Sequence, residues 1–161
     1  MIEYILVTLL AYNFPVHFDA EQELNAAVII DKSVELNEDP YFMVALSWVE
    51  CRVKTGRVSH TGDYGLFQVN YRFWGKKWGY KSSQKFLVDM SSPAHSTVAA
   101  VTVLNEMRRY KSCKGLNLPA CYNGGPNWQK SKNIEKIKAY ATKVHRMRGI
   151  FKRKFPGWVM K

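Results

Sequence analysis

Two acidic residues, Glu50 and Asp63, lie 13 positions apart in the first half of the chain. Glu50 follows an apolar stretch, and Asp63 begins the block Asp63-Tyr64-Gly65-Leu66-Phe67-Gln68-Val69-Asn70. Cleavage of a glycosidic bond near neutral pH needs one carboxyl group that stays protonated as an acid. It often needs a second carboxyl group that stays ionised opposite the developing oxocarbenium ion. The two residues are therefore candidates for acid–base chemistry on a sugar.

The element that must position Glu50 is a helix expected over residues 40–52. Asp39-Pro40 is typical of a helix start, with Asp as the N-cap and Pro in the first turn. Met43 and Leu46 precede Glu50 by seven and four positions, so all three lie on one helix face. Glu50 should then point along the core-facing stripe, close to the negative end of the helix dipole. Both loss of water and the dipole raise the pKa of a carboxyl group, which suits a general acid.

The rest of the chain predicts further helices and one short extended segment. Helical spacing or helix-start signals occur over 21–37, 91–110, 118–122 and 133–148. Residues 56–65 are rich in turn formers and lead into an alternating extended segment over 66–70, after which an aromatic loop is expected over 71–80. In the helix over 21–37, the apolar positions expected to face the core are Leu24, Ala27, Val28, Val34 and Leu36. In the helix over 91–110, they are Val98, Val101, Leu104 and Met107.

The N-terminal segment from Tyr4 to Val16 is apolar, but it does not read as a signal peptide. It is preceded by Glu3 rather than by Lys or Arg, and no small-residue cleavage site follows it. We expect a packed N-terminal helix there. No run of residues reaches the roughly 18 apolar positions of a membrane span, so no transmembrane segment is predicted.

Length and composition indicate a single domain. At 161 residues and 47% apolar content the chain can bury one core. We expect one globular domain over 1–161, with an N-terminal extension over 1–18 and a basic C-terminal tail over 145–161.

Charge is unevenly distributed along the chain. The formal net charge is +11, yet residues 1–50 carry −8 and residues 129–161 carry +10. Such a field attracts polyanions, whether nucleic acid, anionic lipid or the anionic polymers of a bacterial wall. No nucleic-acid-binding motif accompanies the charge, so no specific nucleic-acid partner is expected. The basic tail could instead bind a wall, a membrane surface or a virion or cell-envelope protein, or form a solvated face with some side chains packed on the domain.

Cysteine and histidine residues give no sign of a metal site. Cys51, Cys113 and Cys121 lack the C-x-x-C spacing of zinc or redox sites, and the four histidines are scattered without an H-E-x-x-H pattern. No metal and no cofactor are predicted. Cys113 and Cys121 could form a disulfide, but we expect reduced, partly buried thiols.

Four blocks stand in a fixed order along the chain. They are Trp48-Val49-Glu50-Cys51, Gly62 to Asn70, Cys121-Tyr122-Asn123-Gly124-Gly125-Pro126, and Tyr140. This order resembles the lysozyme-like lytic transglycosylase family, the soluble lytic transglycosylase catalytic domain. That family carries a Glu-Ser at a helix end, a Gly-Leu-Met-Gln-Ile block, an Ala-Tyr-Asn-Ala-Gly block and a late Tyr. The resemblance covers roughly residues 21–144 and implies a mainly α, lysozyme-like α+β fold, with a small extended or hairpin segment flanking an active-site groove.

The Asp63 block is also similar to animal-type lysozymes, which carry Asp-Tyr-Gly-Ile-Leu-Gln-Ile-Asn followed by Arg-Trp-Trp. In those enzymes the Asp is the second catalytic carboxylate, and here Asp63 could equally be a turn residue. The chain departs from the transglycosylase pattern where Cys51 replaces Ser, Phe67 replaces Met, and Cys121 and Gly124 replace Ala.

The resemblance implies roles for individual residues. Glu50 would be the general acid and base, with Tyr122 hydrogen-bonded to it. Gln68 and Asn123 would hold the N-acetyl and hydroxyl groups of the sugar.

Three more residues complete the substrate-binding set. Gly65 would let the backbone approach a sugar closely, and Phe67 and Tyr140 would join it in the groove. Trp74, Trp78 and Trp128 could stack on sugar faces or simply pack in the core.

The function implied is a peptidoglycan-cleaving muramidase of the lytic transglycosylase type. It would act on the bacterial wall, in the periplasm or outside the cell, at the β-1,4 bond between N-acetylmuramic acid and N-acetylglucosamine of the glycan strands. A small basic chain without a clear signal peptide also fits delivery by a phage particle. Two alternatives stay open: a lysozyme-type hydrolase that uses Glu50 and Asp63, and a non-catalytic wall-binding or virion structural protein.

Overall fold

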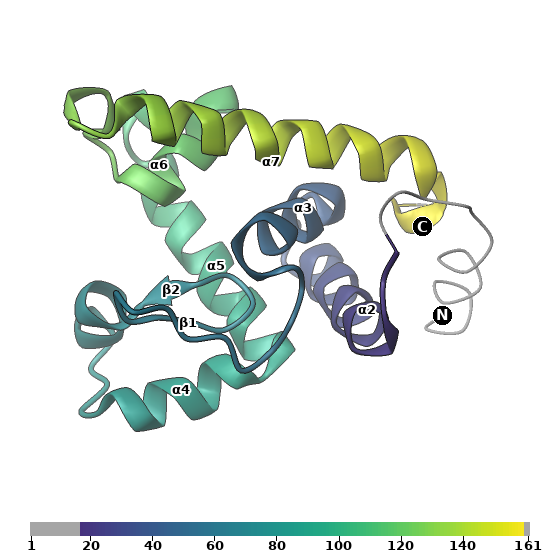
Figure 1. Ribbon diagram of the computed structural model, residues 1–161, viewed down its shortest axis with the longest axis horizontal. Helices are drawn as coiled ribbons and strands as arrows, with labels where there is room; N and C mark the ends of the chain where they lie inside the picture. The colour runs from purple at the N-terminus through teal and green to yellow at the C-terminus, as the bar shows by residue number, and fades with distance from the viewer. Residues whose placement is uncertain (1–16, 160–161) are drawn as a thin grey trace.

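The computed structural model describes residues 17–159 and shows a mainly helical fold (Figure 1). The predicted helix over Tyr4 to Val16 lies outside the described residues. The predicted mainly α fold with a small hairpin is confirmed. The described residues are mostly helical, and their sheet consists of two antiparallel strands. The main elements are α2 (Ala20–Glu35), α3 (Pro40–Cys51), β1 (Asp63–Tyr64), β2 (Val69–Asn70), α4 (Ser83–Ser91), α5 (Pro93–Arg108), α6 (Leu118–Gly124) and α7 (Ile134–Lys154).

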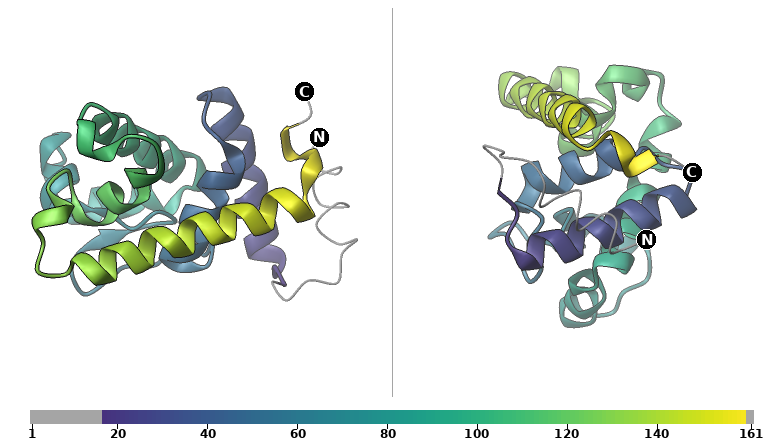
Figure 2. Two further views of the ribbon diagram at one scale, coloured as in Figure 1. Left: turned by 90° about the horizontal axis from the view of Figure 1, so that it is seen from above. Right: turned by 90° about the vertical axis from the view of Figure 1, so that its right-hand side faces the viewer.

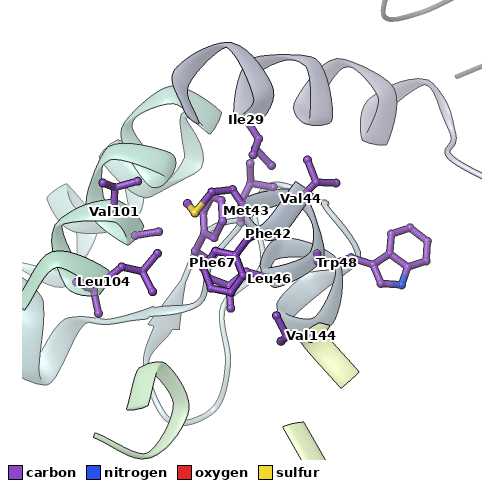
Figure 3. Close-up of a cluster of buried hydrophobic side chains, with 14 of the residues drawn as sticks. Ile29, Phe42, Met43, Val44, Leu46, Trp48, Phe67, Val101, Leu104 and Val144 are labelled. Carbon is purple, nitrogen blue, oxygen red and sulfur yellow. The ribbon is translucent and has the colours of Figure 1, made fainter. Parts of the chain in front are cut away.

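The helix that carries Glu50, α3, is the centre of the fold. It packs against α2 on one side and against the long helix α7 on another, as Figure 1 shows. Residues 40–48 are all buried, because the helix is apolar on every face rather than along one stripe. In Figure 3 the side chain of Phe67 lies beside those of Phe42 and Leu46, with Leu104 of α5 nearby, so the chain after β1 completes this core.

Both ends of α3 are well defined. The Asp39 carboxylate accepts hydrogen bonds from the backbone N–H groups of Tyr41 (2.9 Å) and Phe42 (3.2 Å), and Pro40 occupies the first turn, so the predicted start is confirmed. The helix ends at Cys51, where Arg52 takes a left-handed conformation with φ of 61°. Glu50 is therefore the second-last residue of the helix.

A second layer is formed by the hairpin, α4 and α5. The hairpin pairs Asp63 with Asn70 and Tyr64 with Val69. It contacts α4 and α5, on the opposite side of the molecule from the start of α2 (Figure 1). Helix α7 runs along the length of the molecule over α3 and α6, as the left view of Figure 2 shows. The second layer places the Asp63 block opposite the end of α3.

Two segments differ from the sequence prediction between the hairpin and α5. The expected aromatic loop over 71–80 begins as a π-helix, Tyr71–Gly75, because the Asn70 side chain caps it by accepting a hydrogen bond from Phe73 N (3.0 Å). Helix α4 was not predicted. Its buried residues are only Phe86 and Met90, and this pair of positions is too few to give a readable helical stripe.

Some expected core positions are exposed instead. Leu24, Val34 and Val98 are 57%, 45% and 41% exposed. On α2 the predicted Ala27 is buried, but the buried face also carries Ala26, Ile29 and the polar Asn25, which were not predicted. On α5, Ala99, Ala100 and Val103 take the core position expected for Val98.

The last helix is longer than predicted. It continues past Arg148 to Lys154, so residues 145–154 of the expected tail are helical. Met147 and Phe151 are buried on its inner face, and Phe155 is buried directly after it. The Arg148 guanidinium also pairs with Asp39 at 2.5 Å, which joins α7 to the start of α3. The basic side chains Lys143, Arg146, Lys152 and Arg153 are exposed.

Cys113 and Cys121 form a disulfide, so the expectation of reduced thiols was wrong. Their Cα atoms are 5.5 Å apart, within the usual range for a disulfide. The turn over Lys111–Cys113 folds back on α6 and brings together two residues separated by eight positions. Cys51 is a free, buried thiol.

We expect this disulfide to stabilise the fold by about 2.5 kcal/mol, because it closes a short loop in the unfolded chain. Reduction with dithiothreitol should then lower the melting temperature by about 5–10 °C. The double variant Cys113→Ser and Cys121→Ser should melt at the reduced temperature with or without reductant. Equal melting curves for the oxidised and reduced wild type, with reduction verified by thiol titration, would contradict this expectation.

Candidate active site

A cavity of about 620 Å³ opens between the hairpin, α5 and α6, at the end of α3. Both predicted catalytic carboxylates lie in its wall. Its lining residues come from separate segments of the chain: Glu50, Ser59, Asp63, Gln68, Val69, Asn70, Phe73, Trp74, Val103, Met107, Cys121, Tyr122, Asn123, Gly125 and Pro126.

The Glu50 carboxyl group lies in the wall of this cavity and is largely shielded from water. Burial raises its pKa to about 7, and the nearby negative charge of Asp63 acts in the same direction. A hydrogen bond donated by the Tyr140 hydroxyl to Oε1 opposes the shift, because it favours the ionised form. The net result is a carboxyl group that is partly protonated at neutral pH and able to donate a proton.

Asp63 lies in the same wall but in a polar setting. Burial tends to raise its pKa, but hydrogen bonds from Ser59, Thr61 and Asn70 outweigh that effect, and the pKa lies below its ordinary value. Ser59 Oγ donates at 2.6 Å and Asn70 Nδ2 at 2.7 Å. Asp63 is therefore ionised at neutral pH while Glu50 can hold its proton, which is the division of charge that two-carboxylate glycosidase chemistry uses.

The tyrosine that contacts Glu50 is not the one that the sequence suggested. The Tyr122 hydroxyl, expected to bond Glu50, donates instead to the backbone oxygen of Phe67 at 2.8 Å, although Tyr122 lines the cavity. The hydrogen bond to Glu50 comes from Tyr140 of α7. Burial, and then the charge of Glu50, raises the pKa of both phenols well above the ordinary value, so both stay protonated.

Gln68 and Asn123 both line the cavity, from opposite walls. Gln68 has a left-handed backbone with φ of 47°, and its amide nitrogen donates to the backbone oxygens of Gly65 (2.9 Å) and Arg57 (3.2 Å). These bonds fix its side chain at the hairpin turn. Asn123 is exposed next to Gly125, which ends α6 with φ of 76°.

Gly65 and Phe67 lie behind the cavity rather than on its surface. Phe67 is fully buried in the core. Gly65 has φ of 76°, and a Cβ atom there would lie 2.3 Å from the backbone oxygen of Met90. The glycine therefore permits close packing of the hairpin on α4 and does not serve approach to a ligand.

Phe73 is a cavity residue that the sequence analysis did not assign to the site. Phe73 is 60% exposed and its ring meets that of Trp74 edge to face, with centroids 4.8 Å apart. Both line the cavity, so they offer apolar surface of the kind that stacks on sugar rings. The Arg-Phe-Trp run was a visible signal, but sequence could not tell which ring faces outward. Trp128 is buried, and Trp78 lines a separate pocket on α5.

Comparison with protein families gives a match to the transglycosylase SLT domain over residues 27–145. The chain belongs to this family. It is a peptidoglycan enzyme that cleaves glycosidic bonds. Comparisons with curated proteins and with solved structures give no match.

The matched part of this transglycosylase domain runs from α2 into α7 and contains all eight predicted site residues. The family's Ser position is occupied by Cys51, which lies outside the cavity lining. Its Sγ atom lies within hydrogen-bond distance of the backbone oxygens of Leu66 (3.2 Å) and Lys54 (3.3 Å), so the thiol links the end of α3 to the hairpin segment.

Two further searches concern the described part of the transglycosylase domain. Over residues 17–159, His, Cys, Asp and Glu do not gather in groups of three that could hold a metal ion. Within the same residues, no helix is both long and apolar enough to cross a bilayer.

The raised pKa of Glu50 predicts a pH-dependent gain in stability for Glu50→Gln. As pH rises from about 4.5 to about 7, the unfolded wild type ionises Glu50 while the folded domain keeps it protonated, so the wild type loses stability. Gln stays neutral and avoids this loss. The variant should match the wild type at pH 4 and exceed it above pH 7 by up to about 3 kcal/mol. Urea unfolding across this range tests the expectation, which a pH-independent difference would contradict.

Proposed function

We propose that this chain is a muramidase of the lytic transglycosylase type, with Glu50 as both general acid and general base. Its substrate would be the β-1,4 bond between N-acetylmuramic acid and N-acetylglucosamine. The observation that carries the proposal is a carboxyl group with a pKa of about 7 in the wall of a 620 Å³ cavity, in a chain of the transglycosylase family. No other acidic residue of the described chain combines cavity position with a raised pKa.

The reaction would proceed in two proton transfers at Glu50. The carboxyl group first gives its proton to the bridging oxygen as the C1–oxygen bond breaks, which leaves an oxocarbenium-like sugar and an ionised Glu50. The carboxylate then takes a proton from the incoming hydroxyl group as that oxygen bonds to C1. If the hydroxyl is the muramoyl 6-hydroxyl, the product is a 1,6-anhydro sugar; if it is water, the product is a reducing end.

The surrounding residues would assist these steps without exchanging protons. Tyr140 holds Oε1 of Glu50 and supports the ionised form after the first transfer. Asp63 supplies a fixed negative charge in the same wall, which stabilises a developing positive charge on the sugar. Gln68, Asn123 and Phe73 would contact the sugar rings and their N-acetyl groups. Gly65 lets the hairpin pack closely on α4, and Tyr122 holds the hairpin through the backbone oxygen of Phe67.

The lysozyme-type hydrolase is a second candidate, because Asp63 is ionised and close enough to affect Glu50. A non-catalytic wall-binding or virion protein is a third candidate, of another class, and would bind walls without releasing product. Delivery by a phage particle, and contact with anionic wall polymers or envelope proteins through the exposed basic side chains of α7, are hypotheses from charge and context.

Removal of the acid tests the proposal directly. Glu50→Gln should retain the fold and lose at least about 1000-fold in clearing of purified cell walls, because Gln cannot donate a proton to the bridging oxygen. Mass spectrometry of the muropeptides released by the wild type should show species lighter by one water, the anhydro products. Clearing by Glu50→Gln at the wild-type rate would remove Glu50 from the mechanism. Reducing ends in place of anhydro ends would favour the hydrolase.

Removal of the Asp63 charge tests whether this residue is a second reacting carboxylate. If Glu50 is the sole reacting carboxyl group, Asp63→Asn should keep activity within about 10-fold of the wild type near pH 5. The alkaline limb of its pH–activity profile should move to lower pH, because the charge that raises the pKa of Glu50 is gone. Ser59→Ala, which removes a hydrogen bond and leaves the charge, is the control for altered hairpin geometry. A loss above about 100-fold in Asp63→Asn alone would favour the two-carboxylate mechanism.

A further inference from the structure

The chain turns sharply directly after the helix that carries Glu50. Arg52 and Val53 both take left-handed backbone conformations, with φ of 61° and 59°. Such values are uncommon for residues other than glycine and are outliers for a β-branched residue such as Val. Val53 is also fully buried. A turn of this kind persists only where the surrounding structure holds it.

The side chains that hold the turn come from the start of α2. Gln22 Nε2 donates to the backbone oxygen of Arg52 at 2.7 Å, and Asn25 Nδ2 donates to the backbone oxygen of Val53 at 2.8 Å. Both amides are buried, with 6% exposure each. They lie three positions apart on one face of α2, so together they bind two successive carbonyl groups. We call Gln22 and Asn25 the amide clamp.

Further contacts from the same helix start extend the amide clamp along the chain. Lys54 forms an ion pair with Asp19 at 2.7 Å. Glu21 accepts hydrogen bonds from both the backbone N–H (2.8 Å) and the hydroxyl (2.7 Å) of Thr55. Four consecutive residues, 52–55, are therefore bound by the first turns of α2.

The orientation of the Gln22 amide is fixed by a second bond. Its Oε1 accepts a hydrogen bond from the backbone N–H of Asp19 at 2.8 Å, as part of the capping box that starts α2. With the oxygen used at the cap, the nitrogen faces the Arg52 carbonyl. Asn25 has no part in the capping box, so it reports on the turn alone.

This turn controls the last turn of α3, where Glu50 stands two positions before Arg52. The N–H groups of Arg52 and Val53 close the helix end by donating to the backbone oxygens of Trp48 (3.1 Å) and Ser47 (3.4 Å). If the two left-handed residues relaxed to ordinary conformations, these bonds would break and the helix end would fray. The Glu50 side chain would then gain water and lose its fixed distance from Tyr140.

We propose that Gln22 and Asn25 are positioning residues for Glu50, which act by holding the left-handed turn that ends α3. The inference rests on the proposed role of Glu50 as the acid. Neither amide lines the cavity, and both residues lie outside the stretch matched by the family, so a role in binding substrate is not implied.

Two near-isosteric variants test the proposal, Gln22→Met and Asn25→Leu, each of which removes the amide donors and keeps most of the volume. Each should lower kcat on soluble glycan fragments by about 10-fold or more, with KM within about twofold, because the acid is displaced while the sugar contacts remain. The alkaline limb of kcat should move to lower pH by roughly half a unit or more, because a hydrated Glu50 regains a more ordinary pKa.

The other titratable groups around Glu50 do not contribute to the alkaline limb of kcat. The titratable groups that face it are Tyr140 on α7, Tyr122 on α6, Asp63 on β1 and its neighbour Cys51. The pKa values of the two tyrosines and of Cys51 are raised and that of Asp63 is lowered, so none of these groups titrates near pH 7.

The matched control is Glu38→Gln, which weakens the ion pair of Glu38 with Arg108 (2.6 Å) before the other end of α3. It should lower the melting temperature without moving the pH limb. Rescue comes from Arg52→Gly, since glycine takes the left-handed conformation without penalty. In the Gln22→Met background it should restore kcat to within about threefold of wild type.

The outcomes separate the two claims. Two results would overturn the positioning role while Glu50→Gln stays inactive. The first is a loss of kcat in the amide clamp variants equal to that in Glu38→Gln at equal melting temperature. The second is an alkaline limb of kcat that does not move in the amide clamp variants. An active Glu50→Gln would overturn the proposed function instead. If Asn25→Leu does not fold, Gln22→Met and its rescue by Arg52→Gly decide the question.

Discussion

The withdrawal of one carboxyl group from water is the constraint on which the site depends. Glu50 is the second-last residue of a helix whose other residues are almost all apolar and which lies between α2 and α7. Because the helix is packed in the core, the carboxyl group near its end is also largely removed from water. Because the charged form of Glu50 is disfavoured there, the group keeps a proton at a pH where an ordinary glutamate has lost it.

The two carboxyl groups of the cavity have pKa values shifted in opposite directions because their surroundings differ, not because their residue types differ. Glu50 meets a buried phenol and apolar side chains, whereas Asp63 is held by hydroxyl and amide donors of its own hairpin. One group is therefore poised to donate a proton while the other is a fixed charge. The fold achieves this because α3 and the hairpin belong to different layers, with the disulfide-linked α6 as the opposite wall.

Sequence predicted the parts of this arrangement that are local. Asp39-Pro40 identified the start of α3, and the helix expected over 118–122 corresponds to α6. The order of four short blocks indicated the family, which the match over 27–145 shows. The last helix was expected over 133–148, but its final turns depend on the packing of Phe151 and Phe155 on the core, which the sequence pattern did not reveal.

What sequence could not supply depends on contacts between distant segments. The exchange of Tyr122 for Tyr140 at Glu50 joins residues 90 positions apart, and the amide clamp joins α2 to residues some 30 positions later. The Cys113–Cys121 pair required knowledge of how the Lys111–Cys113 turn folds back. Gly65 was assigned to the cavity because a glycine beside a motif suggests ligand approach, yet its neighbour is the Met90 carbonyl.

The most direct test is a measurement of the Glu50 proton itself. Carbon-13 NMR of the side-chain carboxyl groups, with Glu50 assigned by comparison with Glu50→Gln, follows its ionisation as pH is varied. Our account predicts a midpoint near pH 7, well above the ordinary value for a glutamate side chain. A midpoint near 4.5 would show a hydrated, ionised group and would contradict the account.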